Sequence, residues 1–152
     1  MRPPVAGETI QRNPEPTSLR ARLDELQVDA RRLQLEHNHG PLAVLRQLLG
    51  ESTIAALCWN DDGTFVFANA AASSLTGHST AELRRLSVWQ LTPTAQEHEA
   101  ELLWRAFFAQ GEQSGEYQVV TKGGRILTAA YAARVTFMPG LHLSLLRAVP
   151  PA

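Results

Sequence analysis

One stretch near the middle of the chain decides the fold: Asp61-Asp62-Gly63-Thr64-Phe65-Val66-Phe67-Ala68-Asn69-Ala70, continued through Leu75-Thr76-Gly77. Its Asp62-Gly63 pair is typical of a two-residue hairpin turn, because such turns need positive φ angles. The apolar run from Ile54 to Trp59 before the turn is too short for a helix and predicts a strand. The β-branched and aromatic residues after the turn predict a second strand that pairs with the first.

Short helices are predicted directly after this hairpin. Asn69 can cap a helix over 70–75 by accepting a backbone N–H bond, and Gly77 supplies the left-handed exit from it. Ser79 and Glu82 then form the sequence pattern of a capping box, which opens the next helix. The region therefore predicts a hairpin followed by two short helices.

This order of features resembles the start of a PAS domain. That family often has an aspartate-glycine turn, a strand ending in asparagine, a short helix, and then Leu-Thr-Gly-aromatic-Ser-x-x-Glu-Leu. Here Leu75-Thr76-Gly77 and Ser79 to Leu83 match, and His78 stands at the aromatic position. The resemblance covers residues 53–147. It implies an α+β fold in which short helices cover one face of a five-stranded antiparallel sheet, and a sensory role.

The rest of the region fits that order. A long helix is predicted over 94–110, with Thr94 as its cap and with Ala100, Leu103, Trp104 and Phe107 on one face. Gly111 ends this helix, and a polar turn is predicted between Gly111 and Gly115. Three further strands are predicted as a meander over 117–121, 126–137 and 141–146. We expect residues 148–152 to be a tail.

The N-terminal part predicts a helical extension over 17–49, after a proline-rich segment, 1–16, that we expect to be disordered. Leucine and alanine recur in a heptad pattern over 19–33, and Ser18 or Thr17 can cap this helix, with Arg20 and Asp24 forming an i,i+4 pair. The apolar seam can cover the sheet of its own chain or pair with a second chain, and its narrow width favours the second arrangement. The predicted dimer-interface residues are Leu19, Leu23, Leu26, Leu33, Leu42, Leu45 and Leu49.

Composition excludes several classes of function. The 152 residues carry a formal net charge of −1, which is not the basic footprint of a nucleic-acid-binding protein. No apolar run reaches the roughly 18 residues that a membrane span needs. The single cysteine, Cys58, excludes an intrachain disulfide and a cysteine-rich zinc site. We expect a cytoplasmic protein that has no nucleic-acid or membrane partner.

No catalytic or metal site is predicted. The chain has no phosphate-binding glycine loop and no nucleophile with a recognisable base, so it reads as a non-enzyme. His37-Asn38-His39 offers too few ligands for zinc. His98 lies in the helix that carries the iron ligand in haem-binding PAS domains, but it points about 160° away from the Ala100 face, so it is a weak haem-ligand candidate. The segment 80–91 lacks the cysteine of light-sensing LOV domains, which leaves a non-covalent flavin open.

The resemblance implies a pocket between the sheet and its helices. The residues predicted to line it are Phe67, Leu75, Trp89, Leu103, Phe107, Val119 and Tyr131. The sequence therefore predicts a homodimeric module that senses a small apolar ligand or a partner and signals through its N-terminal helices. It would act on a signalling protein in trans or be a piece of a longer sensor. The alternatives are a ligand-free PAS interaction module and, third, a haem- or flavin-bearing redox or gas sensor.

Overall fold

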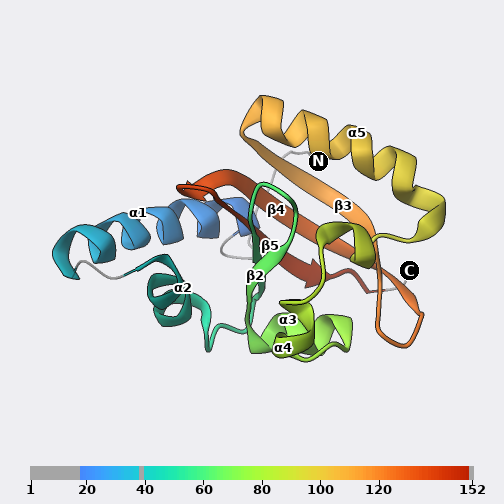
Figure 1. The fold of residues 1–152 in the computed structure, drawn as a ribbon, viewed down its shortest axis with the longest axis horizontal. Helices are drawn as coiled ribbons and strands as arrows, with labels where there is room; N and C mark the ends of the chain where they lie inside the picture. The colour runs from blue at the N-terminus through green and yellow to red at the C-terminus, as the bar shows by residue number, and fades with distance from the viewer. Residues whose placement is uncertain (1–17, 38–39, 151–152) are drawn as a thin grey trace, which may run out of the picture.

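A five-stranded antiparallel sheet is the centre of the fold, as predicted (Figure 1). The computed structural model describes residues 18–37 and 40–150, so the segment expected to be disordered, 1–16, lies outside the described residues. The strand order is β2-β1-β5-β4-β3. The strands are β1 (Ala55–Trp59), β2 (Phe65–Ala68), β3 (Glu112–Val120), β4 (Ile126–Met138) and β5 (Leu141–Ala148).

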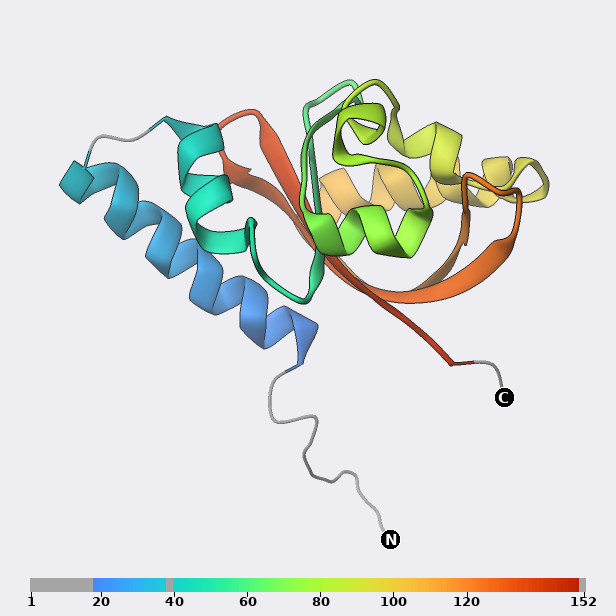
Figure 2. The ribbon, with the colours of Figure 1, turned by 90° about the horizontal axis from the view of Figure 1, so that it is seen from below.

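Helices cover both faces of this sheet (Figure 2). One face carries the N-terminal pair, α1 (Leu19–His37) and α2 (Pro41–Leu49), and the other face carries the remaining helices. Those are α3 (Ala70–Thr76), α4 (Thr80–Leu83), the 3₁₀ helices η2 (Val88–Leu91) and η3 (Thr94–Gln96), and α5 (Glu97–Gln110). The sheet thus separates two apolar cores, which we call the α1/α2 core and the α5-side core.

The Asp62-Gly63 turn packs directly against the α5 side. Gly63 has a φ of +86°, and a Cβ atom added to it would lie 3.1 Å from Val88 Cγ2. Its carbonyl oxygen also accepts a hydrogen bond of 2.9 Å from the backbone N–H of Val88. Glycine is therefore needed at this position both for the turn and for the close approach of η2.

The side chain of Asn69 connects α2, β1 and α3. Its Oδ1 atom accepts from the backbone N–H groups of Ala72 and Ala56, both at 3.0 Å, so the predicted cap of α3 is confirmed. Its Nδ2 atom donates to the carbonyls of Leu49 and Ile54, both at 2.9 Å. This buried side chain therefore ties the end of α2 and the start of β1 to α3 with four hydrogen bonds.

A β-bulge changes the side-chain pattern of β2. Trp59 pairs with Phe65 and Cys58 pairs with Phe67, so the register shifts between these two rungs. Because the bulge adds one residue, Phe65 faces the α5-side core whereas Val66 and Phe67 face the α1/α2 core. Phe67 was predicted to line the pocket, but the bulge places it on the opposite face of the sheet.

The heptad seam of α1 packs on the chain's own sheet. Leu23, Leu26 and Ala30 are each 1% exposed, and they contact residues of β4 and β5 in the α1/α2 core. Six of the seven residues predicted to form a dimer interface are buried in this way within one chain, and Leu42 remains 41% exposed. The structure thus has the arrangement that the sequence left as the alternative, because buried apolar residues of the sheet pack against the seam.

Thr94 does not cap the long helix as predicted, because it begins the 3₁₀ helix η3 and α5 starts only at Glu97. The turn between β1 and β2 is also longer than the predicted two-residue hairpin, since residues 60–64 lie between the paired Trp59 and Phe65.

Two other local predictions were wrong. Arg20 does not use Asp24 as its partner: the two residues bond Glu112 and Arg134 of the sheet instead. The predicted polar turn between Gly111 and Gly115 belongs to β3, which begins at Glu112 and pairs with β4 along its whole length. This strand lies at the edge of the sheet, where polar residues face solvent, so it lacks an apolar alternation.

Candidate functional site

A cavity lies between the sheet and the helices η2 and α5. All five strands contribute to its floor, and the two helices cover it. It is lined by Leu57, Trp59, Phe65, Val88, Trp89, Leu91, Thr92, Ala100, Leu103, Trp104, Phe107, Gln113, Tyr117, Tyr131, Ala133 and Ser144. The cavity therefore occupies the place at which the sequence predicted a pocket.

Four of the seven predicted pocket residues line this cavity: Trp89, Leu103, Phe107 and Tyr131. Val119 is buried in the α5-side core away from it, and Leu75 borders a surface depression beside the β3–β4 turn. Sequence reasoning missed Trp59, Phe65 and the polar groups of β3. The register shift beside Trp59 leaves no mark in the sequence that would show which face this side chain takes.

The cavity is small. Its volume is about 120 Å³. An apolar cavity of roughly 150 Å³ binds benzene, whereas pockets for drug-sized ligands span roughly 300–1,000 Å³. The space therefore matches a molecule of a few heavy atoms and is far smaller than a haem or a flavin ring system.

The lining is polar in places but uncharged. None of the described residues that border the cavity has a charged side chain. Burial raises the pKa of both Tyr117 and Tyr131, and the neighbouring Tyr131 raises that of Tyr117 further, so both hydroxyls stay protonated. Because an unpaired ion is strongly disfavoured in such surroundings, the cavity suits a neutral ligand.

A chain of hydrogen bonds joins the cover of the cavity to its floor. The hydroxyl of Tyr131 on β4 donates to Oε1 of Gln113 at 2.7 Å, and Nε2 of Gln113 donates to the carbonyl of Leu103 on α5 at 3.2 Å. Gln113 therefore connects α5 to strands β3 and β4. Any ligand that moves α5 will also pull on this side chain.

Aromatic rings continue from the cover of the cavity to β5. The centroids of Trp89 and Trp104 lie 5.1 Å apart, those of Trp104 and Phe108 4.9 Å, and those of Phe108 and His142 4.9 Å. His142 is 1% exposed, and its Nδ1 accepts from the backbone N–H of Thr136 at 2.8 Å. Its Nε2 therefore carries the proton and donates to Oδ1 of Asp61 at 2.7 Å. This histidine holds the β1–β2 turn, β5 and α5 together.

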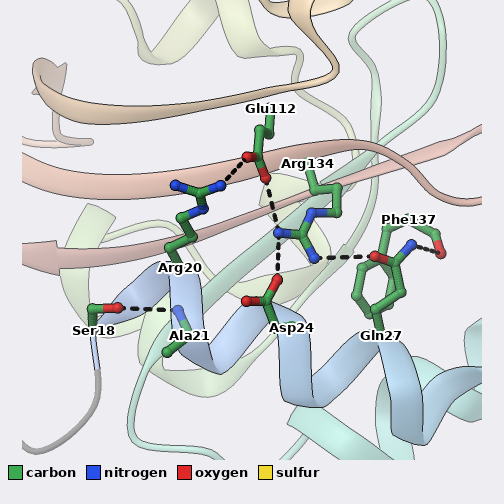
Figure 3. A network of polar contacts seen from close by, with 8 residues as sticks. All are labelled: Ser18, Arg20, Ala21, Asp24, Gln27, Glu112, Arg134 and Phe137. Atoms are coloured by element: carbon green, nitrogen blue, oxygen red, sulfur yellow. Dashed lines mark hydrogen bonds and ion pairs between the residues drawn. The ribbon is translucent and has the colours of Figure 1, made fainter.

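A polar network lies on the other face of the sheet, between α1 and strands β3 and β4 (Figure 3). Arg134 of β4 is its centre: Nη2 bonds Asp24 Oδ1 at 2.7 Å and Glu112 Oε1 at 2.9 Å, and Nη1 bonds Gln27 Oε1 at 3.0 Å. Arg20 Nη2 bonds the second oxygen of Glu112 at 2.6 Å. We call these five side chains the Arg134 network.

The Arg134 network is unusually well placed to hold α1 on the sheet. The Arg134 side chain is only 14% exposed. Burial acts to lower its pKa, but the hydrogen bonds to Asp24 and Glu112 outweigh this effect and raise the pKa, so the guanidinium stays charged. Several charge-assisted bonds share one ordered arginine, an arrangement that is stronger than isolated surface pairs.

The cavity and the Arg134 network share the same part of the sheet. Glu112 pairs with Arg134, and the next pair along the two strands is Gln113 with Ala133. Gln113 and Ala133 line the cavity, whereas Glu112 and Arg134 belong to the network on the opposite face. Consecutive residues of β3, and likewise of β4, thus face α1 and the cavity alternately.

The residues weighed for cofactor chemistry lie away from the cavity. His98 is exposed on α5 and is not among the lining residues. Cys58 is buried in the α1/α2 core, across the sheet, where burial raises the pKa of its thiol to about 12. Asn38 and His39 lie outside the described residues. Within the described part of the chain, no three His, Cys, Asp or Glu side chains come together as a metal site. No helix described there combines the length and the apolarity that crossing a bilayer requires.

Comparison with known proteins agrees with this architecture. Similar solved structures include a PAS domain from a two-component sensor histidine kinase (TM-score 0.61, 14% identity, 71% of this chain and 96% of that chain covered). Another is a PAS domain from Colwellia psychrerythraea (TM-score 0.61, 18% identity, 72% and 98% covered). A third is the PAS domain, in complex with ethanol, of a LuxR-family transcriptional regulator from Burkholderia thailandensis (TM-score 0.58, 15% identity, 68% and 96% covered).

The search of curated proteins found no match. The family model for the PAS fold matches residues 43–147, which is more than half of the chain and covers most of α2, the five strands except the last residue of β5, and the cavity. The chain therefore belongs to the PAS family.

Proposed function

We propose that this chain is a sensory PAS module that binds a small neutral ligand in its cavity and signals through α1. The observation that carries the proposal is that the cavity pair Gln113 and Ala133 lies directly beside the network pair Glu112 and Arg134 on the same two strands. A size match adds support, since the cavity of about 120 Å³ suits ligands of the size that the Burkholderia PAS domain holds, namely ethanol.

The route from ligand to α1 is short in this proposal. A ligand that displaces Leu103 pulls on Gln113 through its hydrogen bond to the Leu103 carbonyl. Glu112 follows Gln113 because the two are consecutive residues of one edge strand, and Glu112 bonds both Arg134 and Arg20. A ligand shifts this equilibrium only if it binds one arrangement of the network better than the other.

Amide hydrogen exchange of α1, measured with and without cyclopentanone as a small neutral ligand, tests this coupling. We expect saturating cyclopentanone to slow amide exchange over residues 23–33 about fivefold or more, within the usual range of coupling between sites. In Arg134→Met the probe still binds but the slowing of α1 is lost, because the network no longer joins sheet and helix. Arg32→Met is the matched control, since Arg32 pairs with Asp29 on the helix itself. Unchanged exchange of α1 in the saturated wild type would rule out the proposed signalling route.

A second candidate function is homodimerisation through the outward face of α1. Val28 and Leu35 are 64% and 86% exposed and lie seven residues apart, which is the heptad period of a helix pair. A second copy of the chain would cover both side chains with the same two residues of its own α1. This surface differs from the buried seam that the sequence favoured.

Sedimentation velocity tests this second candidate. The wild type is expected to be a dimer at micromolar concentration, and Leu35→Glu a monomer, because each copy would bring a carboxylate into the contact. Leu102→Glu is the matched control, since Leu102 is an exposed leucine, 52% accessible, on α5 at the other face of the sheet. A dimeric Leu35→Glu variant would place the interface elsewhere, and a monomeric wild type would remove this candidate.

A further inference from the structure

One buried polar group beside the cavity has no protein partner. Trp59 lines the cavity and is 6% exposed, and among the described residues no group accepts a hydrogen bond from its indole N–H. Other polar groups of the lining are paired: Tyr131 donates to Gln113, and Thr92 donates to the carbonyl of Val88 at 3.0 Å. Native proteins rarely leave a fully buried donor unpaired, so this N–H is an exception that needs a reason.

The chemistry of an indole N–H restricts what can pair with it. Tryptophan is a donor only, so its partner must supply an acceptor atom. The lining carries no charge, which disfavours an anion, and a neutral oxygen is then the acceptor that fits. A hydrocarbon of the same shape would fill the space but leave the donor unpaired, and sites of this kind discriminate strongly against such analogues.

We propose that the cavity recognises a compact neutral molecule with one acceptor oxygen, of about six heavy atoms or fewer by comparison with benzene-sized cavities, and that Trp59 Nε1–H is the donor that selects it. This inference rests on the proposed ligand-binding function and adds the ligand's chemical class and the residue that reads it. Short ketones and alcohols belong to this class. The remaining surface of such a ligand packs against the rings of Phe65, Trp104 and Phe107.

Two probes of matched shape separate hydrogen bonding from packing. Cyclopentanone and methylenecyclopentane differ only by an oxygen in place of a CH₂ group. In ¹⁵N-labelled full-length protein, the indole signal of Trp59 is identified by its loss in Trp59→Phe. We expect cyclopentanone to shift this indole proton downfield in the wild type and methylenecyclopentane to leave it near its starting position.

The affinities of the two probes give the second measurement. We expect Trp59→Phe to weaken cyclopentanone binding about five- to tenfold, as the loss of one hydrogen bond would, and to change methylenecyclopentane binding less than about twofold. Trp89→Phe is the matched control, because Trp89 lines the same cavity, and it should affect both probes by similar factors.

The outcomes distinguish this inference from the function on which it rests. If both probes bind but neither the indole shift nor the Trp59→Phe affinities depend on the oxygen, the role of Trp59 is overturned and ligand binding stands. If neither probe binds the wild type, ligand binding in this cavity and the role of Trp59 both fail. If Trp59→Phe does not fold, the indole signal of Trp59 is assigned as the one of the chain's three tryptophan signals that neither Trp89→Phe nor Trp104→Phe removes, and its shift in the wild type still decides the question.

Discussion

Asn69→Ala is expected to lower the free energy of unfolding by about 3–4 kcal/mol, because the four backbone groups that it satisfies are left without their partner in a buried place. The loss of the α3 cap alone accounts for about 1 kcal/mol of this. The remainder comes from the groups of Leu49, Ile54 and Ala56. Urea unfolding followed by circular dichroism measures the change.

Asn60→Ala is the matched control for that experiment. The Oδ1 atom of Asn60 also accepts two backbone N–H bonds, from Asp62 and Thr64, but it does so in the exposed hairpin turn. Water can replace the lost oxygen there, so we expect an effect of about 1 kcal/mol or less. Equal losses for the two variants would mean that Asn69 does not hold α2, β1 and α3 together.

Leu26→Ala is expected to destabilise the protein by about 3 kcal/mol, within the range for a leucine truncated in a packed core. Leu26 is 1% exposed between α1 and the sheet. Leu35→Ala on the outward face of the same helix should change stability by about 0.5 kcal/mol or less, because Leu35 is 86% exposed. Both values are measured by urea unfolding at a protein concentration at which the chain is monomeric.

This pair of variants also decides which face of α1 the sheet holds. If α1 instead presented Leu19, Leu23, Leu26 and Leu33 to a second chain, Leu26→Ala would leave the stability of the monomer unchanged. That result would contradict the docking of α1 on its own sheet. A large loss at Leu26 and a small one at Leu35 supports it.

Local chemistry made much of the fold predictable from sequence. Ser18, Asn69 and the Ser79–Glu82 box cap the helices as predicted, and Gly77 and Gly111 end theirs with positive φ angles. These signals act over a few residues, and so they can be read from a short stretch of chain. The five-stranded antiparallel sheet followed from the PAS resemblance, which depended on the same stretch around the hairpin.

The details that failed depend on partners far apart in sequence. Phe67 faces α1 because of a bulge against β1, and Asp24 pairs with Arg134 rather than Arg20 because α1 lies across β4. A heptad seam has the same pattern whether it meets a sheet or another helix, so it could not show what covers Leu23 and Leu26. Of the cavity residues, Leu103 and Phe107 were predicted and share the helix face that their spacing indicated, whereas Trp59 was missed because its face depends on register.

The position of Cys58 makes its thiol a reporter of how often α1 and α2 detach from the sheet. It is the single cysteine of the chain, and it lies fully buried beneath these helices with a pKa raised to about 12 by burial. A thiol reagent can reach it only in molecules whose N-terminal helices have left the sheet. The labelling rate of the unmodified protein therefore counts those openings, and no engineered probe is needed to follow them.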